Sequence, residues 1–311
     1  MKTILVTGGA GFIGSNLALE LQHRYPDAWI TVLDDFRSAN FKNLEGFAGD
    51  VVAADIAQLD LEAQFGEPAF DAVFHLASIT DTREMDQSLQ VHDNVEGFRN
   101  LLEYLEPIKT PIVYASSAAT YGIGSGINRI TDDPKPANIY AFSKAILDNL
   151  ARRSSKQYDD WKIVGLKYFN VYGPREAHKG VPASMIYHLA QQMNEGNRPR
   201  IFKMGEQMRD FVYVKDIVRF TIQALDAPQS CILNAGSGQA RSFNDLVQIL
   251  NDVLGTSYEP EYIDNPFAFY QPHTEADMSE TIKMLGIEPE YTFEKGIKDY
   301  YDSGYLVETN S

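Results

Sequence analysis

The chain has 311 residues, of which 44% are hydrophobic, and a formal net charge of −16 at pH 7. Its length and hydrophobic content suit one large α/β unit or two lobes with their own cores. The negative charge argues against nucleic acid or an anionic membrane as a partner, and no apolar run approaches the ~20 residues that cross a bilayer.

The first predicted elements are a strand, a glycine-rich turn and a helix. Residues 4–6 form an apolar, β-branched run, and glycines follow at Gly8, Gly11 and Gly14, where apolar positions of a helix begin. Glycine allows the tight turn and the close approach of a pyrophosphate, and the helix N-terminus offers free N–H groups to phosphate. This order predicts a dinucleotide site, with an ordinary glycine-rich turn as the alternative.

Further strands and helices alternate up to residue 170. We expect strands at 29–34, 51–56, 71–77, 111–117 and 162–170, with helices near 84–106 and 138–158. This alternation predicts right-handed βαβ units and an α/β, Rossmann-type, doubly wound parallel sheet.

An acidic residue stands where the second predicted strand ends. Asp34 follows Gly14 at the distance where a carboxylate binds a ribose hydroxyl. Arg37 could pair with a 2′-phosphate instead, so the local chemistry leaves NAD and NADP open. Asp55, at the end of the third predicted strand, would face the adenine.

The alternation loosens after about residue 172. The expected elements there are helices at 182–196, near 215–226 and at 242–254, and a short strand at 201–203. We therefore expect a Rossmann domain at 1–171 plus about 206–236, and a smaller mixed α/β substrate-binding lobe at 172–205 and 237–311. Ligands should bind at the carboxyl ends of the strands, where both parts meet.

The sequence Tyr140-Ala-Phe-Ser-Lys144 lies on a predicted helix, and Ser117 ends the preceding strand. Residues four apart share a helix face, so an ammonium could lower the tyrosine pKa from about 10 towards neutrality. A serine hydroxyl could hold the substrate oxygen. Such a set suits hydride transfer between an alcohol carbon and nicotinamide, the alternative being an accidental pair on a surface helix.

Cys231 is the single cysteine and lies in a strand-like run, where it should act as a buried small hydrophobe. The chain starts directly with its first strand, without a secretory signal, and we expect a cytoplasmic protein. The histidines show no metal-binding spacing, so no metal site is predicted.

Several segments together resemble the extended short-chain dehydrogenases/reductases that act on nucleotide sugars. Within these, the chain is similar to the ADP-glycero-manno-heptose 6-epimerase family over nearly its whole length. The segments that carry the likeness are 114–122, 168–176, 178–180, 209–213 and 270–277.

The resemblance implies an isomerase that oxidises C6″ of ADP-D-glycero-D-manno-heptose with tightly held NADP. The hydride would return to the other face and give the L-glycero epimer. Both faces need an acid/base group, and the family pattern matches Tyr140 and Lys179 to these roles. A lysine can act so when it is partly desolvated or near a cation, and Arg175 and His178 are its neighbours. Without the resemblance, Lys179 would be taken for a surface loop lysine.

The resemblance also implies the remaining contacts, a homo-oligomer, often a pentamer, and a role in lipopolysaccharide biosynthesis. The cofactor positions are Gly8, Gly11, Phe12, Ile13, Gly14, Asp34, Asp35, Arg37, Asp55, Leu76, Ala77, Ser78, Asn94, Tyr140, Lys144, Val171 and Lys179. The substrate positions are Ser117, Asn170, His188, Phe202, Lys203, Met204, Gly205, Arg209 and Tyr270. Arg209 would bind the diphosphate or form a salt bridge with Asp210 or another acid, and His188 could equally be an ordinary half-buried histidine.

Three departures from the family pattern concern specificity rather than reaction type. Asn40 lies where some members have a lysine for a 2′-phosphate, the 78–82 loop is more acidic, and Val181 replaces an expected serine. Other readings also remain open. A UDP-hexose 4-epimerase would not need Lys179, and a non-enzymatic NADP sensor would tend to lose Tyr140 or Lys144. A 4,6-dehydratase usually carries an Asp-Glu pair where this chain has alanines.

Overall fold

The protein is described by a computed structural model for residues 1–81, 86–264 and 272–307. A seven-stranded sheet has the order β11-β7-β5-β4-β1-β2-β3, and all its neighbouring strands are parallel. The strands are β1 Thr3–Thr7, β2 Trp29–Asp34, β3 Asp50–Ala53, β4 Ala72–His75, β5 Ile112–Ser117, β7 Ile163–Tyr168 and β11 Cys231–Ala235. The predicted Rossmann-type parallel sheet is confirmed.

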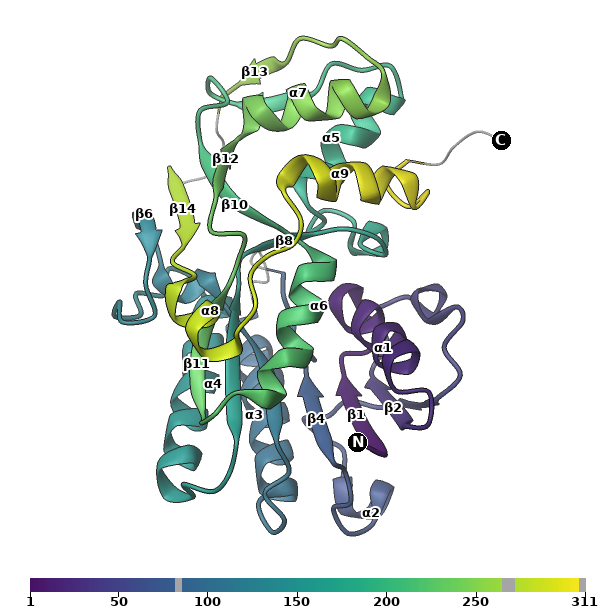
Figure 1. The fold of residues 1–311 in the computed structure, drawn as a ribbon, viewed down its shortest axis with the longest axis vertical. Helices are drawn as coiled ribbons and strands as arrows, with labels where there is room; N and C mark the ends of the chain where they lie inside the picture. The colour runs from purple at the N-terminus through teal and green to yellow at the C-terminus, as the bar shows by residue number, and fades with distance from the viewer. Residues whose placement is uncertain (82–85, 265–271, 308–311) are drawn as a thin grey trace.

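Helices cover both faces of this sheet (Figure 1). On one face α1 (Phe12–Arg24) contacts α6 (Val214–Gln223), and on the other α3 (Gln87–Leu105) contacts α4 (Ile139–Gln157) and the short α2 (Leu61–Phe65). Side chains alternate across a strand, so Ile4 and Val6 belong to one core cluster and Leu5 to the other. All three are fully buried, which is why the middle of the first strand has no polar position.

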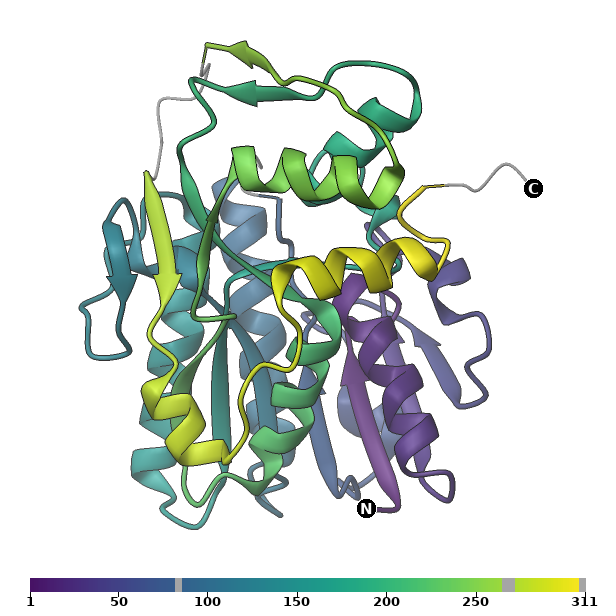
Figure 2. The ribbon, with the colours of Figure 1, turned by 45° about the horizontal axis from the view of Figure 1, so that its top comes forward.

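Most of the remaining elements lie beyond the carboxyl ends of these strands, whereas α8 (Ser279–Leu285) packs against β11 (Figure 2). A second sheet has the order β12-β10-β14-β6, with β8 paired to β10, and β13 pairs with β9. These strands are β6 Ser125–Asn128, β8 Asn170–Tyr172, β9 Arg200–Phe202, β10 Met208–Tyr213, β12 Ala240–Ser242, β13 Glu261–Ile263 and β14 His273–Ala276. The helices are α5 Met185–Asn194, α7 Phe243–Leu254, α8 Ser279–Leu285 and α9 Phe293–Asp302. The short 3-10 turns are η1 Phe41–Leu44, η2 Ala118–Tyr121, η3 Ala177–Lys179 and η4 Ala224–Asp226.

Three predicted strands of the first sheet end at least two residues earlier than expected, and one of them, predicted at 71–77, stops at His75. The strand predicted at 51–56 stops at Ala53, because the Asp55 carboxylate accepts a hydrogen bond from the Ala57 N–H at 2.9 Å and forms a turn. The strand predicted at 162–170 stops at Tyr168. Asn170 then begins β8, which leaves the first sheet and pairs with β10.

The strand predicted around Cys231 is β11, at the edge of the seven-stranded sheet. The thiol is half-buried rather than buried, since an edge strand has no neighbour on one side. Burial raises the pKa of this thiol to about 11. Among the described parts of the chain, no helix is both long and apolar enough to cross a membrane.

Candidate active site

The turn between β1 and α1 has the shape that a bound dinucleotide needs. A Cβ at Gly8, whose φ is +69°, would lie 2.5 Å from the Ala77 nitrogen, and one at Gly14 would lie 2.0 Å from the Gly8 oxygen. Only glycine therefore allows this close packing. No side chain caps the start of α1 at Gly11, so its first N–H groups can receive a phosphate.

The loop after β4 packs against this turn and is held by Asn94. The Asn94 side chain is buried; its oxygen accepts from the Ile79 N–H at 2.7 Å and its amide donates to the Ser143 hydroxyl at 2.9 Å. Leu76, Ala77 and Ser78, three predicted cofactor positions, are half-buried on this loop.

At the end of β2, the buried Asp34 carboxylate accepts hydrogen bonds from the Ala10 and Phe36 N–H groups, each at 2.9 Å. Burial raises the pKa of Asp34, against the backbone hydrogen bonds, which lower it. The carboxylate thus joins the glycine turn to the strand end where a ribose would lie. Arg37, offered above as a 2′-phosphate ligand, contacts carboxylates on three sides.

Tyr140, Lys144 and Ser117 lie together, as their spacing predicted. The Ser117 hydroxyl hydrogen-bonds the Tyr140 phenol and accepts from the Ala119 N–H at 3.1 Å. The Lys144 ammonium lies 5.9 Å from the centre of the Tyr140 ring and donates to the Ala115 carbonyl at 2.8 Å. Asn138 caps α4, two residues before Tyr140, by accepting from the Ala141 N–H, which fixes where this helix begins.

The predicted direction of the tyrosine pKa is wrong for the protein alone. Burial raises the pKa of Tyr140, and the hydrogen bond with Ser117 opposes it. Lys144 is buried as well, and burial lowers its pKa to about 8. The lysine directs its ammonium at a carbonyl rather than at the phenol oxygen.

Lys179 lies on a short turn, η3, whose conformation depends on Glu176. This buried carboxylate accepts from the Gly173 N–H at 3.1 Å and from the N–H and hydroxyl of Ser184 at 2.6 and 2.8 Å. Ser184 in turn caps α5. Glu176 therefore closes the loop that presents Lys179.

Burial lowers the pKa of Lys179, as a partly desolvated acid/base group requires, and Glu176 opposes the shift. The neighbouring groups Arg175 and His178 make hydrogen bonds of their own. Arg175 donates to the Asn43 carbonyl at 3.1 Å, and His178 bonds the Arg175 carbonyl. Lys179 is instead half-buried, with its ammonium 5.5 Å from the Phe12 ring centre at the start of α1.

The Lys179 segment is attached to the glycine turn by two asparagines. The Asn16 amide donates to the carbonyls of Phe12 and Pro174 at 2.8 and 3.0 Å. The Asn43 amide lies 3.0 Å from both the Ala10 carbonyl and the His178 ring nitrogen. Residues over 130 positions apart in sequence thus form one wall of the site.

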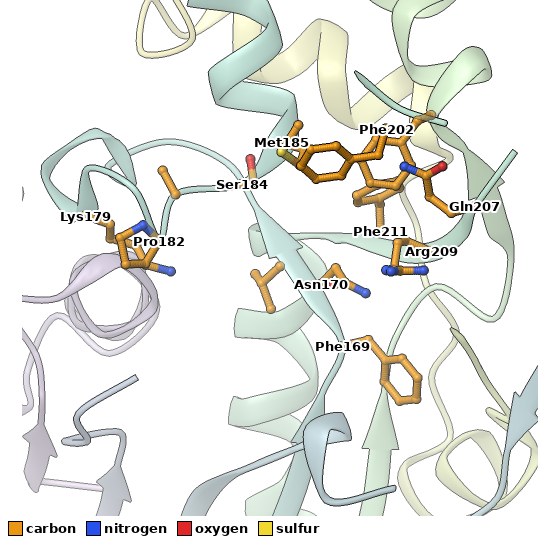
Figure 3. Close-up of a pocket in the computed structure, with 13 residues that line it drawn as sticks. Phe169, Asn170, Lys179, Pro182, Ser184, Met185, Phe202, Gln207, Arg209 and Phe211 are labelled. Carbon is orange, nitrogen blue, oxygen red and sulfur yellow. The ribbon is translucent and has the colours of Figure 1, made fainter. Parts of the chain in front are cut away.

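A pocket of about 420 Å³ opens beside this wall (Figure 3). It is lined by Phe169, Asn170, Val171, Lys179, Pro182, Ala183, Ser184, Met185, Phe202, Gln207, Arg209, Phe211 and Phe243. In Figure 3 the Lys179 and Pro182 side chains lie near α1, and Arg209, Gln207 and Phe202 lie at the opposite side. Because Tyr168 pairs with Ser117 across β5 and β7, this pocket starts at the strand ends that carry Ser117.

The pocket gathers five of the predicted positions, namely Asn170, Val171, Lys179, Phe202 and Arg209. The other predicted positions within the described residues do not line this pocket. His188 bonds the Val181 carbonyl at 3.1 Å and is half-buried, as its alternative interpretation allowed.

Three further predicted positions form the turn that follows β9, outside the pocket lining. Lys203 has a φ of +53°, Met204 is 57% exposed, and the Gly205 carbonyl accepts from the Phe243 N–H. Tyr270 lies outside the described residues. Asp210 is not a partner of the Arg209 guanidinium in the described contacts, because its buried carboxylate accepts from Ser237, Gly238 and Ala276.

Sequence reasoning missed Asn16, Asn43, Glu176, Ser184 and Gln207. One local signal existed, since Ser184 directly precedes the apolar positions of α5 and is a typical N-cap. Asn16 and Asn43 act through partners distant in sequence, and the sequence neighbours of Glu176 and Gln207 do not single these two out.

The comparisons with known proteins agree with this geometry. The model of the NAD dependent epimerase/dehydratase family matches residues 4–236. The ADP-L-glycero-D-manno-heptose-6-epimerase of Alkalilimnicola ehrlichii is 39% identical over 96% of this chain and 97% of its own.

Two solved structures have the same fold throughout. The ADP-L-glycero-D-manno-heptose-6-epimerase of Helicobacter pylori has a TM-score of 0.91 and 41% identity, covering 98% of this chain and 97% of its own. A UDP-glucuronic acid 4-epimerase from Bacillus cereus, in complex with UDP-glucuronic acid and NAD, has a TM-score of 0.86 and 28% identity, covering 98% of each chain. The family match spans most of the chain and includes the glycine turn, Ser117, Tyr140, Lys144 and Lys179. This chain belongs to the NAD dependent epimerase/dehydratase family.

Proposed function

We propose that this protein converts ADP-D-glycero-D-manno-heptose to ADP-L-glycero-D-manno-heptose by transient oxidation at C6″. The observation that carries the proposal is the position of Lys179. It lines the pocket, its segment is bonded to the glycine turn, and its ammonium is desolvated beside Phe12. A second acid/base group at the cofactor end of the pocket is what inversion at a hydroxyl-bearing carbon needs.

The chain's own groups would handle the protons. Ser117, through its hydrogen bond with Tyr140, would hold the sugar oxygen beside the phenol. Tyr140 and Lys179 would each serve one face of the carbon, one removing the hydroxyl proton and the other returning a proton to the carbonyl oxygen. A lysine with a lowered pKa can do both. When bound, a nicotinamide supplies the hydride acceptor and donor, so the net reaction consumes no cofactor.

The other side of the pocket would bind the nucleotide diphosphate. Arg209 presents a planar guanidinium there, which pairs well with phosphate oxygens. Phe202, Phe211 and Phe243 line the same region and offer apolar area to a base or sugar. Two relatives, at 39% and 41% identity, are both named ADP-L-glycero-D-manno-heptose-6-epimerase. Their names support ADP-heptose rather than a UDP-hexose as the substrate.

The cofactor is a nicotinamide dinucleotide, in keeping with the family and with the glycine turn. The NADP predicted from the resemblance requires Arg37 to be available for a 2′-phosphate.

We further propose that 1–171 plus about 206–236 hold the cofactor and that 172–205 and 237–311 hold the sugar nucleotide. The first sheet and α6 support this division, although β10, assigned to the cofactor part, pairs within the second sheet. A homo-oligomer in the cytoplasm, serving lipopolysaccharide synthesis, completes the proposal. The single cysteine suits such a reducing compartment.

The test is incubation of the protein with ADP-D-glycero-D-manno-heptose and analysis of the sugar at C6″ by NMR. We expect the L-glycero epimer, and no turnover of UDP-glucose under the same conditions. Clean 4-epimerisation of the UDP-hexose without conversion of the heptose would contradict the proposal.

A further inference from the structure

Arg37 lies inside a ring of carboxylates at the ribose end of the cofactor site. Its Nε contacts the Asp35 carboxylate, one terminal nitrogen contacts Asp93, and the other lies 3.1 Å from Asp55. These acids come from three different places: the turn after β2, the turn after β3 and helix α3. Every nitrogen of the guanidinium therefore already faces an anion.

The balance of charge around this point is negative. Three carboxylates contact one guanidinium and leave two net negative charges. His92 is exposed and bonds the Asp93 oxygen that does not contact Arg37, at 3.0 Å. A phosphate placed here would meet more repulsion than attraction.

Arg37 is also costly to redirect. A guanidinium that turned towards a new phosphate would give up charge-assisted bonds to three carboxylates. One of these, Asp93, has a side chain only 8% exposed. Its carboxylate would be left without its guanidinium partner in a poorly solvated place.

We propose that this site selects NAD over NADP, because the carboxylates of Asp35, Asp55 and Asp93 occupy Arg37, the arginine that the sequence offers for a 2′-phosphate. A ribose 2′-hydroxyl, by contrast, can donate to the Asp34 carboxylate, whose position the Ala10 and Phe36 N–H groups fix. The inference rests on the nicotinamide cofactor of the proposed function and is independent of the sugar. It replaces the NADP predicted from the resemblance.

The experiment measures binding rather than turnover. Protein freed of its cofactor is titrated with NADH and with NADPH, following nicotinamide fluorescence. We expect NADH to bind at least about tenfold tighter, which corresponds to about 1.4 kcal/mol. The mass of the dinucleotide released from freshly purified, denatured protein should be that of NAD or NADH.

Variants test whether the carboxylates around Arg37 cause this preference for NAD. Asp93→Asn removes one negative charge and frees part of Arg37, so NADPH affinity should rise several-fold while NADH affinity stays within about twofold. Asp27→Asn makes the same change of charge at an exposed site before β2 and should leave both affinities unchanged.

Three outcomes would overturn the inference. NADPH binding as tightly as NADH is one, and a selective, more than tenfold loss of NADPH affinity in Arg37→Gln is another. Binding of neither dinucleotide is the third, and it would also remove the cofactor from the proposed function. Conversion of ADP-heptose by a protein that holds NADP would also overturn the inference, but it would leave the proposed epimerase activity standing.

Discussion

At the scale of single residues, the site depends on a few groups whose ionisation is set by burial. Lys144 and Lys179 both have lowered pKa values because they are desolvated. Only Lys179 lines the pocket, whereas Lys144 donates to a backbone carbonyl within the fold. Under the proposed function the two lysines would have different roles: Lys144 would position, and Lys179 would exchange protons.

Removing either proposed acid/base group should stop epimerisation without emptying the site. Tyr140→Phe and Lys179→Met should each lower kcat by about 10²-fold or more, with the dinucleotide still bound by fluorescence titration. Lys283→Met, at an exposed lysine of α8, is the matched control and should keep full activity. Near-normal turnover by Lys179→Met would refute the assignment of two acid/base groups.

Glu176 is a positioning residue for Lys179. Burial lowers the pKa of Lys179, and the charge of Glu176 offsets part of that shift. Glu176→Gln removes this charge, so the pKa of Lys179 should fall, and the limb of the kcat/KM–pH profile that belongs to Lys179 should move to lower pH. The buried amide would also face the N–H donors of Gly173 and Ser184, with a loss of stability of about 1–3 kcal/mol.

The pH profile separates this role from a purely structural one. Glu280→Gln, at an exposed carboxylate of α8, should change neither stability nor profile. Loss of stability in Glu176→Gln with an unmoved profile would show that Glu176 supports the loop but not the ionisation of Lys179.

At the scale of secondary-structure elements, a buried ion pair holds the catalytic helix against the sheet. Asp148 on α4 lies 2.8 Å from Lys167 on β7 and accepts from the Tyr114 hydroxyl of β5 at 3.0 Å. Asp148 and Lys167 are 0% and 3% exposed. The pair therefore joins the helix of Tyr140 to the two strands that end at Ser117 and at the pocket.

Lys167→Met should leave the Asp148 charge buried without its ammonium and lower the free energy of unfolding by about 3–5 kcal/mol. Urea denaturation measures this free energy of unfolding. The exposed pair of Lys298 and Asp302 provides the control, where Lys298→Met should cost less than about 1 kcal/mol. The double variant Lys167→Met/Asp148→Leu should recover part of the loss, and equal losses at both lysines would contradict this account.

The elements that could be predicted from sequence are those with strong local patterns. The strands of the first sheet carry runs of buried apolar residues, and Tyr140, Lys144 and Ser117 follow a short, local motif. Four strands of the second sheet escaped prediction because they have only three or four residues each, namely β6, β8, β12 and β14. Such strands are specified by their partners, and β14 pairs in parallel with a strand almost 150 residues earlier. Asn16 and Asn43 were missed for the same reason.

At the scale of the whole molecule, one segment joins the two proposed ligand sites. Residues 173–184 bond to the glycine turn on one side, through Asn16, and line the pocket on the other, through Lys179 and Ser184. Ordering of this segment by one ligand should therefore favour the other.

We expect NADH to tighten the binding of ADP, and ADP to tighten the binding of NADH by the same factor, about fivefold or more. Calorimetric titration of each ligand with and without the other measures both factors. Asn16→Ala, which removes one attachment of the segment, should reduce the factor. Independent binding of the two ligands in the unaltered protein would contradict this coupling.

The attachment between Asn16 and Pro174 has a consequence for biosynthesis. The two residues are 158 positions apart, and a ribosome adds about 5–20 residues per second. The glycine turn therefore leaves the ribosome on the order of 10–30 s before the segment that completes its wall. A nascent chain can thus form β1, α1 and β2 early, but the proton-exchanging wall of the site closes only after the middle of the polypeptide has emerged.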